Sequence, residues 1–282
     1  MKQLLALLSL YYLLSIADAL KIGAFNIKSF GDSKMDNLNT ANLIVNIILR
    51  YDIILIQEVR DSDLSAVKKL MDHLSSVSEH SYSYEISDPL GRDNYKEQYL
   101  FIYKTEMVEI KEYYHYHDNH GYSGTDVFSR EPFVLKVYCP ITVVSEFVLV
   151  PLHAAPKDAL REMDALYDVY EDVLGKWDTD NILFLGDFNC ACSYLSENDW
   201  QHIRLRNSEE FEWLIPDTAD TTVTHTHCAY DRIVVSGSEL HDAIVPESAI
   251  VYDFQEEYSL STEEALAISD HFPVEVELKC TW

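Results

Sequence analysis

The chain has 282 residues, and 48% of them are apolar, which is enough for a large buried core and excludes an intrinsically disordered protein. The 48 acidic side chains outnumber the 21 Lys and Arg side chains, so the net charge is −27. A protein this acidic cannot hold nucleic acid through its overall charge, because the two polyanions repel each other. Any nucleic acid must be met by a local basic patch or through bound cations.

Residues 1–19 have the pattern of a secretory signal peptide. Lys2 gives a positive start, an apolar run follows from Leu4 to Leu14, and residues 17–19 form a small-x-small cleavage site. The run is too short to span a bilayer, which takes about 20 apolar residues. We therefore expect cleavage after Ala19, a secreted protein that does not bind membranes, and one catalytic domain over residues 20–282.

Short apolar runs alternate with segments of helical periodicity along the chain. The expected strands cover residues 20–26, 52–58, 146–153, 181–189, 232–235 and 272–278, and the expected helices cover 40–49, 62–74 and 156–177. Because consecutive positions in these strands are apolar, each strand should be covered on both faces. The pattern alone favours one large α/β domain built on a single parallel sheet. A long exposed loop is expected over residues 113–128.

Polar side chains gather where the expected strands begin or end. Loops beyond strand ends carry the binding residues of many α/β proteins, so this position indicates function. One such residue is weak support, because Asp and Asn also end strands as turn formers. The coincidence extends here to Asn26, Glu58, His153, Asp187, Asn189, Asp231, Asp270 and His271.

These side chains suit the hydrolysis of a phosphodiester. Carboxylate and amide oxygens are the ligands that Mg²⁺ prefers, and the cation neutralises charge that develops on the phosphate. Histidine titrates near neutral pH, so His153 and His271 can act as base for water and acid for the leaving oxygen. Each imidazole needs a carboxylate to fix its tautomer, and Glu97 and Asp231 are the candidates. Which imidazole is the base stays open.

Five segments carry a resemblance to a known family, namely QEVRD at 57–61, PLHAAP at 151–156, GDFN at 186–189, THCAYDR at 226–232 and SDHFPV at 269–274. Together they resemble secreted deoxyribonuclease I, and the likeness runs from Leu20 to about Leu278. The DFN and SDH motifs are shared by the wider endonuclease/exonuclease/phosphatase superfamily, whereas HAAP and CAYDR are much more specific. The resemblance implies a four-layer α/β sandwich of two packed, mainly antiparallel or mixed sheets flanked by helices in a single domain.

The resemblance also implies a role for individual residues. Its two catalytic pairs fall on Glu97 with His153 and on Asp231 with His271. Its positions for phosphate and for a catalytic cation, Mg²⁺ or Mn²⁺, fall on Asn26, Glu58, Asp187, Asn189 and Asp270. Its DNA contacts fall on Arg60 and Tyr95 in the minor groove and on Arg130, Tyr194, Thr226 and Tyr230 near the backbone.

Two structural Ca²⁺ sites are implied as well. One falls on Asp220, Thr222, Thr224 and Thr226, which recur at every second position and would share one face of an extended segment. The other falls on Asp118, Asp126, Glu131 and the carbonyl of Phe128. Carboxylate, hydroxyl and carbonyl oxygens suit a hard cation.

The five cysteines are an odd number, so one or two disulfides leave at least one further thiol. The resemblance pairs Cys192 with Cys228. It puts His120 and Ser123 where mammalian members have a second, short-loop disulfide. The remaining cysteines have no counterpart in the family pattern, and whether they are free thiols or pair with one another stays open. They are Cys139, Cys190 and Cys280.

The activity implied is that of a secreted, Mg²⁺- and Ca²⁺-dependent endonuclease. It would cut double-stranded DNA to 5′-phosphate oligonucleotides as a monomer. Minor-groove contacts read groove width more than sequence, so little sequence specificity is expected. Lys28 and His225 occupy positions where family members vary, and we expect them to tune DNA affinity and pH response.

Some family members bind monomeric actin. Of the matching positions, Tyr84 is kept, while Ile86 and Phe133 replace a valine and an alanine. The bulkier Phe133 is expected to weaken actin binding by a clash.

Two other functional readings stay open. One is a superfamily phosphodiesterase for sphingomyelin or RNA, against which Arg60 and Tyr95 speak, and the other is a non-catalytic calcium-binding interaction protein.

Overall fold

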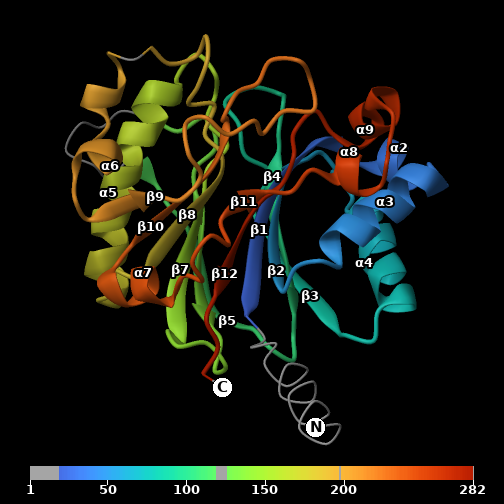
Figure 1. Ribbon diagram of the computed structural model, residues 1–282, viewed down its shortest axis with the longest axis horizontal. Coiled ribbons are helices and arrows are strands. Elements are labelled where there is room, and N and C mark those ends of the chain that lie inside the picture. Colours follow the sequence, from blue (N-terminus) through green and yellow to red (C-terminus); the bar gives the residue numbers. More distant parts are fainter. Residues whose placement is uncertain (1–18, 119–125, 197, 282) are drawn as a thin grey trace, which may run out of the picture.

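The structure is a computed structural model, and it describes residues 19–118, 126–196 and 198–281. Its strands form two six-stranded mixed sheets that pack face to face, with helices outside both (Figure 1). This is the four-layer sandwich implied by the resemblance, and the single parallel sheet favoured by the apolar pattern is wrong. The strands are covered on both faces as expected, but one of the two covers is the other sheet.

The first sheet has the strand order β11-β12-β1-β2-β4-β3. β1 and β2 are parallel, and all other neighbours are antiparallel. The strands are β1 (Leu20–Phe30), β2 (Ile53–Val59), β3 (Tyr82–Ile86), β4 (Gln98–Lys104), β11 (Ile250–Val251) and β12 (Val274–Leu278). The helices on its outer side are α2 (Asp32–Met35), α3 (Leu38–Ile48), α4 (Ser65–Val77), α8 (Phe254–Glu257) and α9 (Thr262–Ile268).

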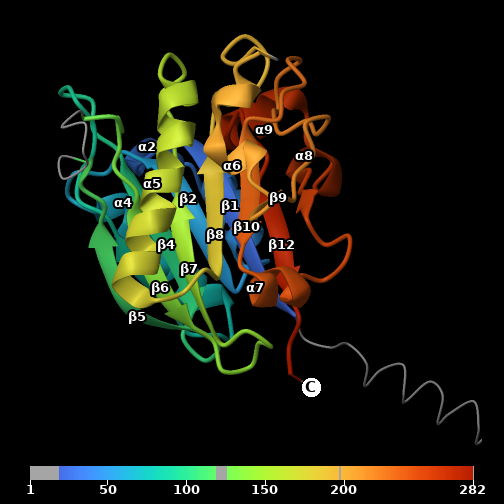
Figure 2. The ribbon, with the colours of Figure 1, turned by 90° about the vertical axis from the view of Figure 1, so that its left-hand side faces the viewer.

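The second sheet has the order β5-β6-β7-β8-β10-β9, and its one parallel pair is β7 with β8. Helix α5 runs along its outer face (Figure 2). The strands are β5 (Glu109–His115), β6 (Phe133–Tyr138), β7 (Glu146–Pro151), β8 (Ile182–Asp187), β9 (Phe211–Trp213) and β10 (Asp231–Ser236). The helices are α5 (Ala159–Trp177), α6 (Arg204–Asn207), α7 (Ser238–Ala243) and the 3₁₀ turn η2 (Trp200–His202).

The two sheets repeat one arrangement. The run β12-β1-β2-β4-β3 and the run β6-β7-β8-β10-β9 have the same sequence of antiparallel and parallel neighbours.

Successive side chains along a strand point to opposite faces of the sheet, so each strand contributes to two different cores. In β1, Ile22 and Ala24 face the core between the sheets, whereas Phe25 and Ile27 pack beneath the outer helices. The parallel pairs therefore end together at one edge of the sandwich.

The expected elements match within a few residues, with two corrections. The helix expected from Pro156 begins at Ala159, and the loop expected over 113–128 loses its first three residues to β5. β3 to β6 were not predicted. His120, Ser123 and the signal peptide up to residue 18 lie outside the described residues. In the part of the chain that the structure describes, no helix has the length and apolarity needed to cross a membrane.

Candidate active site

The residues that the sequence singled out come together at the edge where the parallel strands end. Each sheet contributes about half of them. The first sheet and its adjoining loops carry Asn26, Glu58, Glu97, Asp270 and His271. The second sheet and its loops carry His153, Asp187, Asn189 and Asp231.

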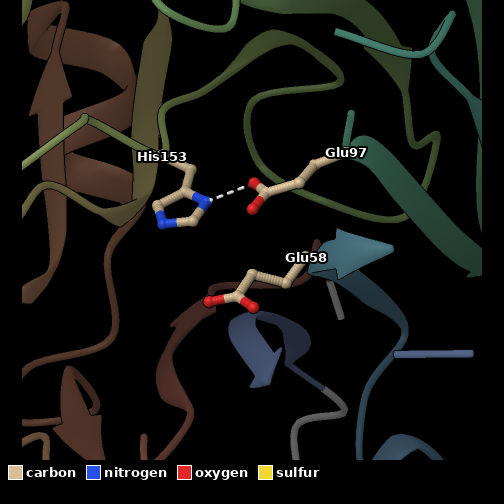
Figure 3. A group of neighbouring side chains, drawn as sticks. All are labelled: Glu58, Glu97 and His153. Carbon is tan, nitrogen blue, oxygen red and sulfur yellow. Dashed lines mark hydrogen bonds and ion pairs between the residues drawn. The ribbon is translucent and has the colours of Figure 1, made fainter. Parts of the chain in front are cut away.

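Two histidine–carboxylate pairs form as predicted. His153 Nδ1 lies 2.8 Å from Glu97 Oε2, and His271 Nδ1 lies 2.7 Å from Asp231 Oδ2. In each pair the histidine and the carboxylate come from different sheets. A carboxylate on Nδ1 fixes the tautomer that leaves Nε2 to exchange a proton with a substrate. Figure 3 shows Glu97 pointing at the His153 ring, with the Glu58 carboxylate beside them.

Asp187 lies between the two imidazoles. Its Oδ2 is 3.6 Å from His153 Nε2 and 3.7 Å from His271 Nε2. The two Nε2 atoms are therefore at most 7.3 Å apart, the sum of those two distances. The two imidazoles converge on one carboxylate, which is the spatial arrangement that the nuclease hypothesis requires.

A buried hydrogen-bond network fixes Asp187. Asn26 Nδ2 donates to Asp187 Oδ2 over 3.1 Å, and the backbone N–H of Asn189 donates to Oδ1 over 3.0 Å. The backbone N–H of Asp187 donates to Gln57 Oε1, and Gln57 Nε2 donates to the carbonyl of Leu152. Gln57 thus ties β2 in one sheet to β7 and β8 in the other. Sequence reasoning gave Gln57 no role, although an amide that directly follows four apolar residues was a signal in the sequence.

The site contains oxygens that fit a divalent cation. Asn26 Oδ1 is buried and has no hydrogen-bond partner within the described ranges. Glu58 is close enough to Glu97 and His153 for one ion to contact all three. Asp187, Asp231 and His271 form a second group of this kind. An orphaned amide oxygen next to carboxylates matches the ligand preference of a hard cation.

Asp270, the fifth predicted cation ligand, is held by a lysine. Lys28 Nζ lies 2.7 Å from Asp270 Oδ2. Burial raises the pKa of Asp270. The hydrogen bond from Lys28 and the charge of His271 lower this pKa by more, so the net shift is downward. Lys28 therefore competes with any cation for this carboxylate.

The two pairs differ in their electrostatics. Burial raises the pKa of Glu97, but the hydrogen bond and charge of His153 outweigh it and hold that pKa at about 2. Burial lowers the pKa of His271, but the charges of Asp231 and Asp187 outweigh it and raise that pKa to about 10. Burial raises the pKa of Asp231. Without a cation beside Asp187, His271 is therefore charged at neutral pH.

Two pairs of side chains flank the site, and three of the four are exposed while Tyr230 is half-buried. The Arg60 guanidinium stacks on the Tyr95 ring at 4.1 Å, and 45% of Tyr95 is exposed. The Tyr194 and Tyr230 rings lie 5.3 Å apart on the other side, next to His271. These predicted DNA contacts offer a cation and aromatic faces to a ligand.

Arg130 is built into the site rather than displayed on it. Its Nε and Nη2 donate to the carbonyl of His153 over 2.9 and 2.7 Å, and its Nη1 lies 3.4 Å from Glu97 Oε2. The side chain is mostly buried. Arg130 thus orients the His153–Glu97 pair, a contact that its predicted place near the DNA backbone did not anticipate.

The two predicted calcium loops both gather oxygens. In residues 220–226 the hydroxyls of Thr222, Thr224 and Thr226 lie within hydrogen-bond distance, and Asp220 accepts from Thr222 over 2.8 Å. The segment is not extended throughout as expected, because Thr222 lies in a β-bridge with His271 and residues 223–226 bend and turn. His225 lies exposed in this turn.

In the second predicted calcium loop, Asp118 is buried. Its Oδ2 accepts from the backbone N–H groups of Val127 and Phe128, while its Oδ1 has no partner among the residues described. Asp126 and Glu131 lie on the same loop. An unpartnered buried carboxylate oxygen again fits a hard cation.

The predicted disulfide between Cys192 and Cys228 is present. It ties the loop after Asp187 to the loop before Asp231. Cys139 and Cys190 are buried thiols outside it. Cys280 forms an isolated β-bridge with Thr142.

Phe133 cannot cause the clash expected at a surface partner. Its ring is fully buried against Tyr113 and His115, with ring centroids 5.3 and 4.9 Å away. Tyr84 and Ile86 lie half-buried on the edge strand β3.

The endonuclease/exonuclease/phosphatase family model matches residues 23–271. Deoxyribonuclease-1 of Equus caballus is 55% identical over 273 residues, or 97% of each chain, and that of Gallus gallus is 56% identical over 275 residues, or 98% of each. Solved structures share the fold at 15% and 13% identity. They are an endonuclease/exonuclease/phosphatase from Bacteroides vulgatus (TM-score 0.63, 93% and 99% of the two chains) and D. rerio TDP2 with a single-strand DNA product (TM-score 0.61, 92% and 98%). The chain therefore belongs to the deoxyribonuclease I group of the endonuclease/exonuclease/phosphatase family.

Proposed function

We propose that this protein is a cation-dependent endonuclease that hydrolyses double-stranded DNA to oligonucleotides with 5′-phosphates. The convergence of His153 and His271 on Asp187 supports the chemistry. The relatives named Deoxyribonuclease-1, about 55% identical over almost the whole chain, support DNA as the substrate.

In the proposed reaction one imidazole takes a proton from water through its Nε2, and the resulting hydroxide attacks phosphorus. The other imidazole gives its Nε2 proton to the 3′-oxygen as the P–O3′ bond breaks, which leaves the phosphate on the 5′ side. Glu97 and Asp231 hold the Nδ1 protons and stabilise each imidazolium. A bound Mg²⁺ or Mn²⁺ would neutralise phosphate charge. The residues proposed to hold it are Asn26, Glu58, Asp187, Asn189 and Asp270.

DNA is proposed to reach the site through its minor groove. The exposed Arg60–Tyr95 stack supports this, because a guanidinium over an aromatic ring is rigid and enters a narrow groove of negative potential. Tyr194, Tyr230 and Thr226 would face the backbone on the other side. Contacts of this kind carry little base information, so cleavage is proposed to be largely non-specific.

The setting of the enzyme forms part of the proposal. We propose that residues 1–19 are removed on secretion, that the mature protein acts as a monomer, and that Ca²⁺ occupies the two loops around Asp118 and Asp220. The orphaned Asp118 Oδ1 supports the first of these calcium sites. Binding of monomeric actin is proposed to be weak, since Ile86 departs from the family residue.

The proposal is tested by nicking of supercoiled plasmid with Mg²⁺ and Ca²⁺ present. His153→Ala should lower the rate by about 10²–10⁴-fold, the usual contribution of a general acid or base. His80→Ala, at an exposed histidine before β3, is the matched control and should leave the rate unchanged. Hydrolysis of RNA or sphingomyelin without plasmid nicking, or an unaffected His153→Ala variant, would refute the proposal. The pH–rate profiles of Glu97→Gln and Asp231→Asn assign base and acid.

A further inference from the structure

We propose that Thr221 is a positioning residue that holds the Asp231–His271 pair in register; this inference rests on the proposed function. Thr221 stands between two predicted calcium ligands, Asp220 and Thr222, and was passed over by the every-second-residue pattern. Its side chain is fully buried, whereas Thr224 is half-buried and Thr226 is exposed. It points to the catalytic pair and not to the calcium loop.

The Thr221 hydroxyl makes three hydrogen bonds. It accepts from the backbone N–H of Tyr230 over 3.1 Å and from that of Asp231 over 3.2 Å, and it donates to the carbonyl of Cys228 over 3.0 Å. A hydroxyl has one donor and two lone pairs, so its hydrogen-bonding capacity is filled. One side chain therefore fixes the backbone that begins β10 and presents the Asp231 carboxylate.

The Thr221 main chain fixes the other member of the pair. Its carbonyl accepts from the N–H of Phe272 over 2.8 Å, and the next residue, Thr222, forms a β-bridge with His271. The N–H of Val223 donates to the carbonyl of Asp270. The acid and its histidine, 40 residues apart in sequence, are thus both anchored to one short segment.

Loss of the hydroxyl would leave two buried N–H groups without an acceptor. The Tyr230–Asp231 backbone would have to shift to find new partners. Misplacement of a reacting group by about 1 Å can cost about 10²-fold in rate. The Arg60–Tyr95 surface belongs to other loops and should keep its place, whereas Tyr230, a proposed contact to the DNA backbone, would move with Asp231. A positioning role therefore predicts a larger effect on kcat than on KM.

The experiment compares three variants with wild type in plasmid nicking at saturating Mg²⁺ and Ca²⁺. Thr221→Val keeps the shape and removes the hydroxyl, and its kcat should fall about 10- to 100-fold with a smaller change in KM. Thr221→Ser restores the hydroxyl and should return most of the activity. Thr142→Val is the matched control, because the Thr142 hydroxyl is also buried and bonds to backbone carbonyls, but in the β6–β7 turn at the opposite edge. Its kcat should equal that of wild type.

A second readout separates positioning from general damage. The Nδ1 proton of His271 should give a low-field ¹H NMR signal that is absent in His271→Gln. This signal should move in Thr221→Val and stay in place in Thr142→Val. Thermal unfolding curves followed by circular dichroism give an assay temperature at which every variant is folded.

Three outcomes would overturn the inference. They are a Thr221→Val variant with wild-type kcat, an equal loss in Thr142→Val, and a loss that disappears when Ca²⁺ is raised above the concentration that saturates wild type, which would assign the effect to the calcium loop. A wild-type protein that nicks no DNA would refute the proposed function instead. The NMR comparison would still test the anchoring of the pair.

Discussion

At position 186 the absence of a side chain lets the two sheets meet at the site. Gly186 has a φ of +127°, a conformation that other residues rarely adopt. A Cβ there would lie 2.6 Å from Gln57 Nε2 and closer still to the carbonyl oxygen of Leu152. The glycine therefore makes room for the amide that links β2 to β7 and β8.

We expect Gly186→Ala to destabilise the protein by about 1–3 kcal/mol through backbone strain, and by more if Gln57 is displaced. Gly175→Ala is the control, since that glycine lies in α5 with open space around it. It should gain about 0.5–1 kcal/mol from the better helix former. Urea unfolding measures both changes, and equal stability of the two variants would contradict the role given to Gly186.

The charge of His271 gives the folded state a pH dependence. Its pKa rises from 6.5 to about 10 on folding, because the nearby carboxylates outweigh burial. A raised pKa contributes stability that is complete below pH 6.5 and is lost as the pH rises through 10.

In the presence of a chelator, the free energy of unfolding of wild type relative to His271→Gln should therefore fall between pH 6.5 and 10. Urea unfolding at several pH values gives this difference, in which ionisations common to both proteins cancel. A difference that stays constant over this range would show that the carboxylates do not hold the proton on His271.

Sequence reasoning finds side chains that do chemistry better than it finds those that hold them. Asn26 and Glu58 stood out because polar residues ended apolar runs, and the resemblance paired each histidine with its acid. Gln57 acts through the carbonyl of Leu152, 95 positions away in the sequence. Thr221 acts through the backbone N–H of Asp231, where β10 begins. No local pattern records such a contact.

At the scale of the elements, consecutive apolar residues showed that the strands were covered on both faces. They did not show whether helices or a second sheet covered each face. A second sheet covers them as well as a helix does, which is why the prediction of one parallel sheet was wrong. The strand β5 was missed because its side chains are mostly exposed or half-buried, so it lacks an apolar run. The long helix α5 was found because its buried positions recur at helical spacing.

The two proposed calcium loops are the elements whose stability should depend on ligands. Asp118 buries a carboxylate oxygen with no partner in the described part of the chain, and Ca²⁺ would relieve that cost. A ligand at about 100 times its Kd stabilises the folded state by about 2.7 kcal/mol. Added Ca²⁺ should therefore raise the melting temperature, and Asp118→Asn should reduce the rise. Asp93→Asn, at an exposed carboxylate, is the control. A melting temperature unmoved by chelator would contradict this prediction.

At the scale of the whole molecule, a net charge of −27 is combined with a site for a polyanion. Arg60, which lies over Tyr95, and Lys28, which pairs with Asp270, are local positive charges at this site. Long-range repulsion is screened within about 8 Å at physiological ionic strength, so local contacts decide whether DNA binds.

The chain builds the second sheet as one continuous stretch inserted between two parts of the first. Strands β1 to β4 are synthesised early and β12 late, yet β12 lies beside β1 and brings His271 to Asp231. A nascent polypeptide that stops before His271 already contains the His153–Glu97 pair but has neither the second imidazole nor β12, which lies beside β1 in the first sheet. Nuclease activity should thus emerge only when synthesis has passed His271, and a premature stop codon upstream of it would yield an inert product.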